Sequence, residues 1–518
     1  MNLFFRFYNG MSRIMNEKNR ISSKDDLIYF KNLVEDSSDT GELSVLLESY
    51  GFLKEYNKLV DFYEAIHSVE GTRKADVADV VDVVVSKLSS TAGTAVSFAI
   101  ATYFTKDLLF VDSDCLFFSE IDTSVLSGRH EDKLNFLQGL LKSDVLTVRS
   151  SFFSRGSLIR CVLNNEVFYI VSLKTPVDAF YQPSTNKVFY SKHGFLNKND
   201  VVGLIKRYLV YYVRSFEEFK QQFFCDRRVG SLTQIARVDR PYHVFSDEMF
   251  SNFILSGSIG EKVPLVYSEE ASFFENERVF SLKELQLLGS ENILFCSHQR
   301  LGFLSSIGQA FLDGIIRRSN NIYAHSSIFC SKVFDGRLVV WISITGGEKP
   351  RLINEIEFLS RLIEYFEQKY DNCFFVFDGY TGTEHVGAKG FEFIAQHEKI
   401  VQSFVEKFKL SERSLSLVGE RLYSKFFYSQ FANIVVSSGT PLIWSSNGNK
   451  EVRLVIHGGS VMLGKVRDFT RADKILLLSD NYKSWEDVSE GLRFDRVSYE
   501  LNLDRVVSGL DSFIGGKV

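Results

Sequence analysis

The sequence predicts an α/β protein in which two units built on parallel sheets follow a helical N-terminal region. Short runs of consecutive apolar residues alternate with amphipathic helical patterns from about residue 237 to 480, whereas the first 145 residues show mainly helical spacing. Uninterrupted apolar strands are buried on both faces, as in parallel sheets covered by helices. Because such sheets bind ligands at the carboxyl ends of their strands, we expect the chemistry at that edge.

The stronger unit extends from 335 to about 480. Its strands are predicted at 337–344, 373–378, 414–418, 433–437 and 452–456. After the first strand, apolar residues recur at spacings of four and three, which places one apolar stripe along a helix: Leu352, Ile356, Leu359, Ile363 and Phe366.

The weaker unit begins near residue 237 and ends near 330. Strand patterns occupy 242–245, 263–267 and 292–297, with helical patterns from Asp247 and at 282–288. Upstream, 161–173 predicts a hairpin around Asn164 and Asn165, because Asn tolerates the positive φ of a tight turn. The predicted domains are a helical, repeat-like region (1–145), two α/β domains (146–330 and 331–490) and a helical tail (491–518) that folds back on the first unit.

Composition excludes several classes of function. The 518 residues carry 24% charged side chains and a net charge of -5, so broad electrostatic binding of nucleic acid is not expected. Six Cys without a CxxC pair favour a reducing cytoplasm over a disulfide framework. We therefore expect a cytoplasmic protein, peripheral to the inner membrane at most, whose N-terminal helices offer a surface to a membrane or protein partner.

Two loops at the carboxyl edge of the stronger unit can hold a phosphate. After the first strand, Gly346 and Gly347 allow a ligand close to the backbone, and Lys349 and Arg351 can neutralise a diphosphate. After the fourth strand, Ser438-Gly439-Thr440 precedes a proline at a predicted helix start, where free N–H groups and the helix dipole favour an anion. The alternatives are a solvated turn and ordinary helix capping.

Further polar residues end the other predicted strands. Asp378 can bond a sugar hydroxyl or simply form an Asp-Gly turn, and His397 and Glu398 lie on a helix that can face the ligand. In the weaker unit, His243 with Asp247 can act as a general base, although a structural histidine is the more frequent outcome.

Two competing sites remain. Ser297 and His298 follow a buried strand of the weaker unit. Asp112 and Asp114 form an Asp-x-Asp after an apolar run, a pattern that can hold a divalent metal bridging a nucleotide diphosphate.

In its segments ISITGGEKPR (342–351) and VVSSGTP (435–441), and in its strand–helix order over 237–518, the chain resembles bacterial GT-B glycosyltransferases. The resemblance implies two Rossmann-like domains facing a cleft, a nucleotide-sugar donor on the C-terminal domain, and a terminal helix that crosses back. Two departures are evident, because the weaker unit lacks a glycine-rich loop and the first 145 residues match no part of that fold.

The function implied by the resemblance is transfer of a sugar from a nucleotide-activated donor to a hydroxyl, in surface-glycan or protein glycosylation. Lys349, Arg351 and the 438–440 turn would stabilise the departing phosphate in place of a metal, so no cofactor is required, and His243 or Asp247 would deprotonate the glycan, lipid-linked or protein acceptor. The alternatives are a metal-dependent GT-A-like transferase that uses Asp112 and Asp114, and a non-catalytic helical scaffold with a degenerate α/β domain.

Overall fold

The structure is a computed structural model that describes residues 109–110, 128–142, 147–153, 156–163, 166–182, 187–190, 230–289, 291–345, 352–384, 388–458, 469–478 and 499–514. The chain forms two compact units that are interleaved along the sequence. Unit 1 contains the described residues up to Ile235, together with Ile254–Leu265 and Phe280–His298; unit 2 contains Ala236–Phe253, Val266–Val279 and the described residues from Gln299 onward. Most of the predicted N-terminal helical region lies outside the described residues, and the predicted domain boundaries stay predictions.

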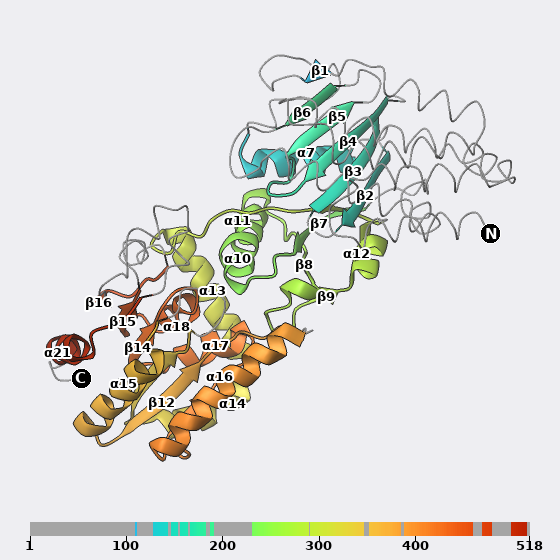
Figure 1. The fold of residues 1–518 in the computed structure, drawn as a ribbon. Coiled ribbons are helices and arrows are strands. Elements are labelled where there is room, and N and C mark those ends of the chain that lie inside the picture. Colours follow the sequence, from blue (N-terminus) through green and yellow to red (C-terminus); the bar gives the residue numbers. More distant parts are fainter. Residues whose placement is uncertain are drawn as a thin grey trace, which may run out of the picture. The chain divides into compact units, whose positions relative to one another are not determined.

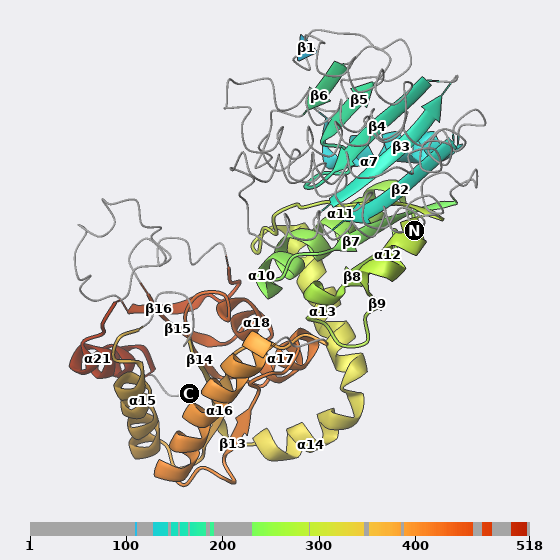
Figure 2. The same ribbon diagram turned by 45° about the vertical axis from the view of Figure 1, so that its right-hand side comes forward.

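Unit 1 is built on a six-stranded sheet, sheet A, with the order β1-β6-β5-β4-β3-β2. Its strands are β1 (Leu109–Phe110), β2 (Thr147–Phe153), β3 (Gly156–Leu163), β4 (Glu166–Ser172), β5 (Ala179–Gln182) and β6 (Lys187–Tyr190). Strands β2 to β6 form an antiparallel meander, and the pairing of Leu163 with Glu166 confirms the predicted hairpin. Helix α7 (His130–Lys142) lies against this sheet (Figure 2). Its Leu134 and Leu137 belong to the core that the helix and the sheet share.

A second sheet, sheet B, has the order β10-β7-β8-β9. Its strands are β7 (Ser231–Ala236), β8 (Leu265–Ser268), β9 (Val279–Phe280) and β10 (Asn292–Phe295), with helix α12 (Leu282–Gly289) before β10 and the short turn η4 (Glu269–Ala271) after β8. Strands β7 and β10 pair in parallel. The core of unit 1 joins apolar residues of these strands, such as Leu232 and Ile293, to those of α7 and sheet A.

The strand predicted at 242–245 is wrong, because these residues are helical. They belong to a continuous helical stretch formed by α10 (Pro241–His243), η3 (Val244–Met249) and α11 (Phe250–Ile259). Pro241 at the first position presets φ for a helix, so it starts one here. In unit 2, the buried ring of Phe245 lies 5.3 Å from that of Phe311 and 5.0 Å from that of Phe426.

Unit 2 is built on a six-stranded parallel sheet, sheet C, with the order β13-β12-β11-β14-β15-β16. Its strands are β11 (Leu338–Ser343), β12 (Cys373–Asp378), β13 (Ser414–Ser416), β14 (Ile434–Ser437), β15 (Arg453–His457) and β16 (Lys474–Leu478). Numbered along the chain, this order is 3-2-1-4-5-6, that of a doubly wound dinucleotide-binding sheet, whose switch point lies between β11 and β14. The predicted α/β class is confirmed, and sheets B and C are compatible with Rossmann-like domains.

Helices cover both faces of sheet C. Besides the helical stretch that begins at Pro241, the described helices of unit 2 are α13 (Ser306–Ile322), α14 (Ala324–Phe334), α15 (Glu355–Lys369), α16 (Ala388–Lys407), α17 (Leu422–Ser429), α18 (Leu442–Asn447) and α21 (Leu503–Ile514). α15, α16 and α21 share one core with Val340 and Phe375, whereas Phe334 of α14 packs on Phe374 from the other face. This double coverage explains why β11 and β12 are buried along their whole length.

Three expectations need correction. Helix α15 begins at Glu355, and Ile356 is 45% exposed because the buried stripe runs through its neighbours Phe358 and Leu359 instead. The sheet has a sixth strand, β16, which was not predicted. The tail joins unit 2 rather than the first unit, with α21 beside β16 and α15 (Figure 1). Among the described helices, none is both apolar and long enough to cross a bilayer.

Candidate functional site

The carboxyl ends of β11 and β14 present buried polar atoms at the switch point of sheet C. Ser343 and Ser437 follow Ile342 and Val436, which pair in the parallel ladder, so the two serines lie next to each other on one face. Both side chains are buried, and within the described ranges neither hydroxyl has a hydrogen-bond partner. Trp341 lies two residues before Ser343 on the same face, and its indole N–H is equally unpartnered. Buried polar atoms without partners are rare and call for an explanation such as a bound ligand.

The turn after β14 opens beside these hydroxyls. Gly439 has φ of 64°, a left-handed conformation that favours glycine. Thr440 is partly exposed, and helix α18 follows directly with no side chain capping it, so the alternative of ordinary Ser or Thr capping does not apply. Because α18 has only six residues, its dipole adds less to an anion site than the sequence suggested. Ser438 lies beneath the turn, with Oγ 3.4 Å from the hydroxyl of Tyr499.

The loop after β11 is described only at its start. Thr345 donates from its N–H and its hydroxyl to Oε1 of Glu355, at 2.6 and 2.7 Å, which ties the loop to the first turn of α15. Gly346, Gly347, Lys349 and Arg351 lie outside the described residues, so their predicted role stays a prediction.

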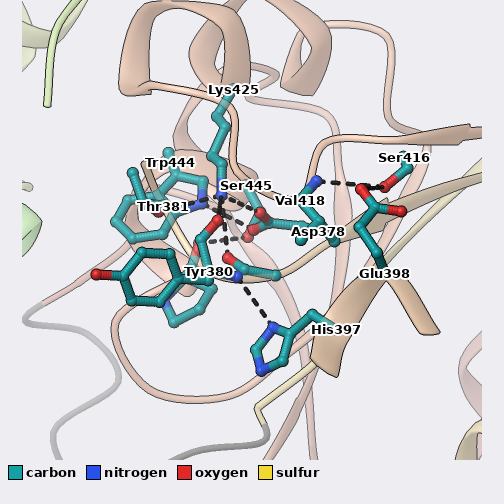
Figure 3. A network of polar contacts seen from close by, with 12 residues as sticks. Asp378, Tyr380, Thr381, His397, Glu398, Ser416, Val418, Lys425, Trp444 and Ser445 are labelled. Atoms are coloured by element: carbon teal, nitrogen blue, oxygen red, sulfur yellow. Dashed lines mark hydrogen bonds and ion pairs between the residues drawn. The ribbon is translucent and has the colours of Figure 1, made fainter. Parts of the chain in front are cut away.

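Asp378 contacts its own chain. The side chain is fully buried at the end of β12, where Oδ1 accepts from Lys425 Nζ at 2.6 Å and Oδ2 accepts from Trp444 Nε1 at 2.8 Å (Figure 3). Lys425 also donates to the carbonyl of Gly379 and the hydroxyl of Thr381. Burial lowers the pKa of Lys425, and Asp378 opposes this shift. In this geometry Asp378 holds the strand end, and its predicted bond to a sugar hydroxyl stays a prediction.

His397 and Glu398 also bind within unit 2. The Nδ1 atom of His397 accepts the N–H of Tyr380 at 3.0 Å, and Glu398 accepts the hydroxyl of Ser416 at 2.9 Å (Figure 3). A Cβ at Gly379 would collide with the His397 ring, so glycine is required for this close approach. Both side chains therefore shape the loop after β12.

His243 and Asp247 do come together. Nδ1 of His243 lies 2.7 Å from Oδ2 of Asp247, and Ser246 donates to the other carboxylate oxygen at 2.8 Å. These residues lie in the helical stretch interrupted by the π-helical segment η3, a distortion that is frequent at functional sites. When Nδ1 donates to the carboxylate, Nε2 of the partly exposed ring is left as a proton acceptor. The pair belongs to unit 2, the unit that contains sheet C.

A buried histidine that sequence reasoning did not single out ends β15. Nδ1 of His457 lies 2.8 Å from the hydroxyl of Tyr499, which in turn approaches Ser438, and the Phe358 ring packs on the imidazole. Burial lowers the pKa of His457 to about 3, so the ring is neutral. The only sequence signal was a polar residue at the end of a buried strand, as for Ser343 and Ser437. The sequence signal for Lys425 was similar, because it is the one charged residue in the aromatic-rich segment 422–429.

Asp112 and Asp114 lie outside the described residues. Within the ranges that are described, no three His, Cys, Asp or Glu side chains cluster in a way that could hold a metal ion. Compared with models of known protein families the chain matches none, and no curated protein matches it.

Proposed function

We propose that the protein transfers a sugar from a nucleotide-activated donor to a hydroxyl acceptor, with the donor bound at the switch point of sheet C. The observation that carries this proposal is the buried, unpartnered hydroxyl pair of Ser343 and Ser437 at the carboxyl ends of β11 and β14. Doubly wound sheets bind nucleotides at this position, and a phosphate-bearing ligand would supply the acceptors that the hydroxyls lack. The assignment to sugar transfer, rather than other nucleotide chemistry, rests on the GT-B resemblance.

In this proposal the turn at Gly439 and Thr440 and the loop cations Lys349 and Arg351 surround the diphosphate. His243 Nε2 takes the proton of the acceptor hydroxyl, while Asp247 holds the ring in orientation. The acceptor oxygen then bonds to the anomeric carbon as the bond to the phosphate oxygen breaks. The negative charge that develops on the leaving nucleoside diphosphate is stabilised by the two cations, so no metal is required.

The test is a thermal-shift screen of nucleoside mono- and diphosphates and nucleotide sugars, each with and without EDTA. A ligand of the folded state raises the free energy of unfolding by roughly 2.7 kcal/mol at a hundredfold excess over its Kd. We expect a shift that survives EDTA and that is lost in Arg351→Ala. Arg361→Ala is the matched control, because Arg361 is an exposed helical arginine that forms only a 3.5 Å ion pair with Glu364.

A shift that EDTA abolishes would contradict this proposal and support the metal-dependent transferase that uses Asp112 and Asp114. The absence of a shift with every nucleotide would reject both transferase readings and favour the scaffold.

A further inference from the structure

Side chains from three segments of unit 1 meet at the carboxyl end of β10. They are His130 and Lys133 from α7, Thr175 and Asp178 from the connection between β4 and β5, and Ser297 two residues after β10; we call them the α7 cluster. Nζ of Lys133 lies 3.0 Å from Oγ1 of Thr175, and Nδ1 of His130 lies 2.8 Å from Oγ of Ser297. None of these groups takes part in the function proposed above.

The cluster lies at the switch point of sheet B. The strand order β10-β7-β8-β9 reads 4-1-2-3 within that sheet, so the chain leaves β7 to one side and returns to the other side at β10. Gln234 near the end of β7 donates to the carbonyl of Ser297 at 3.2 Å, which joins the two strand ends. Parallel sheets of this kind bind ligands outside such a point.

Within the cluster, both carboxylate oxygens of Asp178 already accept hydrogen bonds. Oδ2 of Asp178 accepts three backbone N–H groups, from Leu173, Lys174 and Thr175, at 2.6, 2.8 and 3.1 Å. Its Oδ1 accepts from the Thr175 hydroxyl at 2.7 Å. Asp178 therefore organises the loop and makes no direct hydrogen bond to the nearby ammonium.

The ammonium of Lys133, in contrast to the Asp178 carboxylate, has few hydrogen-bond partners. Its side chain is 3% exposed, and in the described part of unit 1 its one hydrogen-bond partner is Oγ1 of Thr175. Among the described residues, two of its three N–H donors therefore have no acceptor. A buried cation without a hydrogen-bonded anion is unfavourable, and an anionic ligand removes that deficit.

His130 offers a second donor on the same side of α7. It lies three residues before Lys133, so both side chains lie on one face of α7. Burial lowers the pKa of His130 to about 4, so the ring is neutral near pH 7. When the Ser297 hydroxyl donates to Nδ1, the ring proton is on Nε2 and can be donated to a ligand. Because His130 and Thr175 are partly exposed, solvent reaches the rim of the cluster.

We propose that the α7 cluster binds a small oxyanion, a carboxylate or a phosphate group, with Lys133 and His130 as its donors. The inference is independent of the proposed glycosyl transfer, because all residues of the α7 cluster belong to unit 1 and none takes part in that reaction. It assigns a function to Ser297, which the sequence marked only as a competing site.

The experiment is a calorimetric titration of the full chain with inorganic phosphate and, separately, with acetate, at ionic strength kept constant with chloride. We expect one of the two anions to bind, which identifies the class of group. Lys133→Met should weaken that binding at least about tenfold, the effect of losing one charge-assisted hydrogen bond. Lys262→Met is the control, since Lys262 is an exposed lysine of the same unit, and it should keep the wild-type affinity.

Binding of phosphate at the candidate donor site of sheet C is distinguished from binding at the α7 cluster by repeating the titration with Arg351→Ala. Binding that persists there but is lost in Lys133→Met belongs to the α7 cluster. Equal affinity in Lys133→Met and the wild type, or no binding of either anion, overturns the proposal. If circular dichroism shows that Lys133→Met does not fold, His130→Gln, which alters the partly exposed side of the cluster, is judged by the same criterion.

Discussion

Lys425 and Asp378 form an ion pair that is completely shielded from solvent, with 2.6 Å between Nζ and Oδ1. Trp444 donates to the second carboxylate oxygen, so one carboxylate connects the end of β12 to both α17 and α18. In the described structure, the acceptors of Lys425 lie at the end of β12 and in the loop after it, at Asp378 and the three residues that follow. The pair thus fixes the edge of sheet C that borders the candidate donor site.

We expect Lys425→Met to lower the free energy of unfolding by about 3–5 kcal/mol, because it leaves a buried carboxylate without its cation. Chemical denaturation measures this change. The double variant with Asp378→Asn should lose less than the sum of the two single losses. Lys407→Met, which removes an exposed pair with 3.9 Å between Lys407 and Glu364, should cost under about 1 kcal/mol. A similar small loss in Lys425→Met would contradict the assigned role of the pair.

The serines of the switch point should behave differently from ordinary buried serines. Because their hydroxyls have no partner in the described structure, Ser343→Ala and Ser437→Ala should leave the ligand-free protein as stable as before, or up to about 1 kcal/mol more stable. The same changes should weaken nucleotide binding. Thermal unfolding with and without nucleotide measures both effects. Destabilisation of the ligand-free protein with unchanged nucleotide affinity would mean that the hydroxyls are structural.

His243→Gln should lower kcat by about a hundredfold or more while KM for the donor changes little, because general-base catalysis contributes on that scale. Asp247→Asn should act in the same direction, since the amide no longer holds the ring as the carboxylate does. Steady-state rates with a donor found in the nucleotide screen provide the measurement. His325→Gln is the control, because His325 is an exposed histidine of α14. Wild-type kcat in His243→Gln would remove this residue from the mechanism.

Stability should fall as the solution becomes acidic, in part through His457. Burial lowers its pKa from 6.5 to about 3, so between these values the unfolded chain binds a proton that the folded chain excludes. Above pH 6.5 the ring is neutral in both states, and His457 does not reduce the free energy of unfolding. As the pH falls from 6.5 toward 3, protonation of the unfolded chain lowers the free energy of unfolding, by about 2 kcal/mol at pH 5. His457→Gln should flatten the measured dependence of unfolding free energy on pH over this window. An unchanged slope would show that the ring is not held neutral.

Two glycines of helix α13 should respond to alanine in opposite directions. A Cβ at Gly308 would overlap the carbonyl oxygen of Gly302, whereas a Cβ at Gly314 meets no atom closer than 3.9 Å. We expect Gly308→Ala to destabilise unit 2 by roughly 1–3 kcal/mol through overpacking. Gly314→Ala should stabilise it by up to about 1 kcal/mol through helix propensity. Denaturation midpoints of the pair measure both effects, and equal changes would contradict the close approach at Gly302.

Strands that are wholly buried were the most predictable elements. β12 has the predicted bounds, because five consecutive apolar residues and a final Asp contrast with the polar residues on either side. Strand β16 was missed although it contains four consecutive apolar residues; it lies at the edge of sheet C and is therefore only partly buried. At 242–245 an apolar run was read as a strand, although Pro241 favours a helix start at that point.

The candidate site was predictable in its location but less so in its chemistry. The polar residues did end parallel strands, and His243 does meet Asp247, because a separation of four residues brings side chains together on a helical stretch. The partner of Asp378 is Lys425, 47 residues further along the chain, and no local pattern connects them. That the hydroxyls of Ser343 and Ser437 lack partners depends on the packing of the whole sheet edge, which is a property of the fold.

The packing of Phe245 sets an order of events during synthesis. Its ring belongs to an early segment of unit 2, yet it packs against Phe426, which the ribosome adds 181 residues later. At about 10 residues per second, the contact with Phe426 forms no earlier than roughly 20 s after Phe245 has been made, whereas Phe311 is made before that. The helical stretch of His243 therefore completes its native packing only after β11, β12 and β13 have been made.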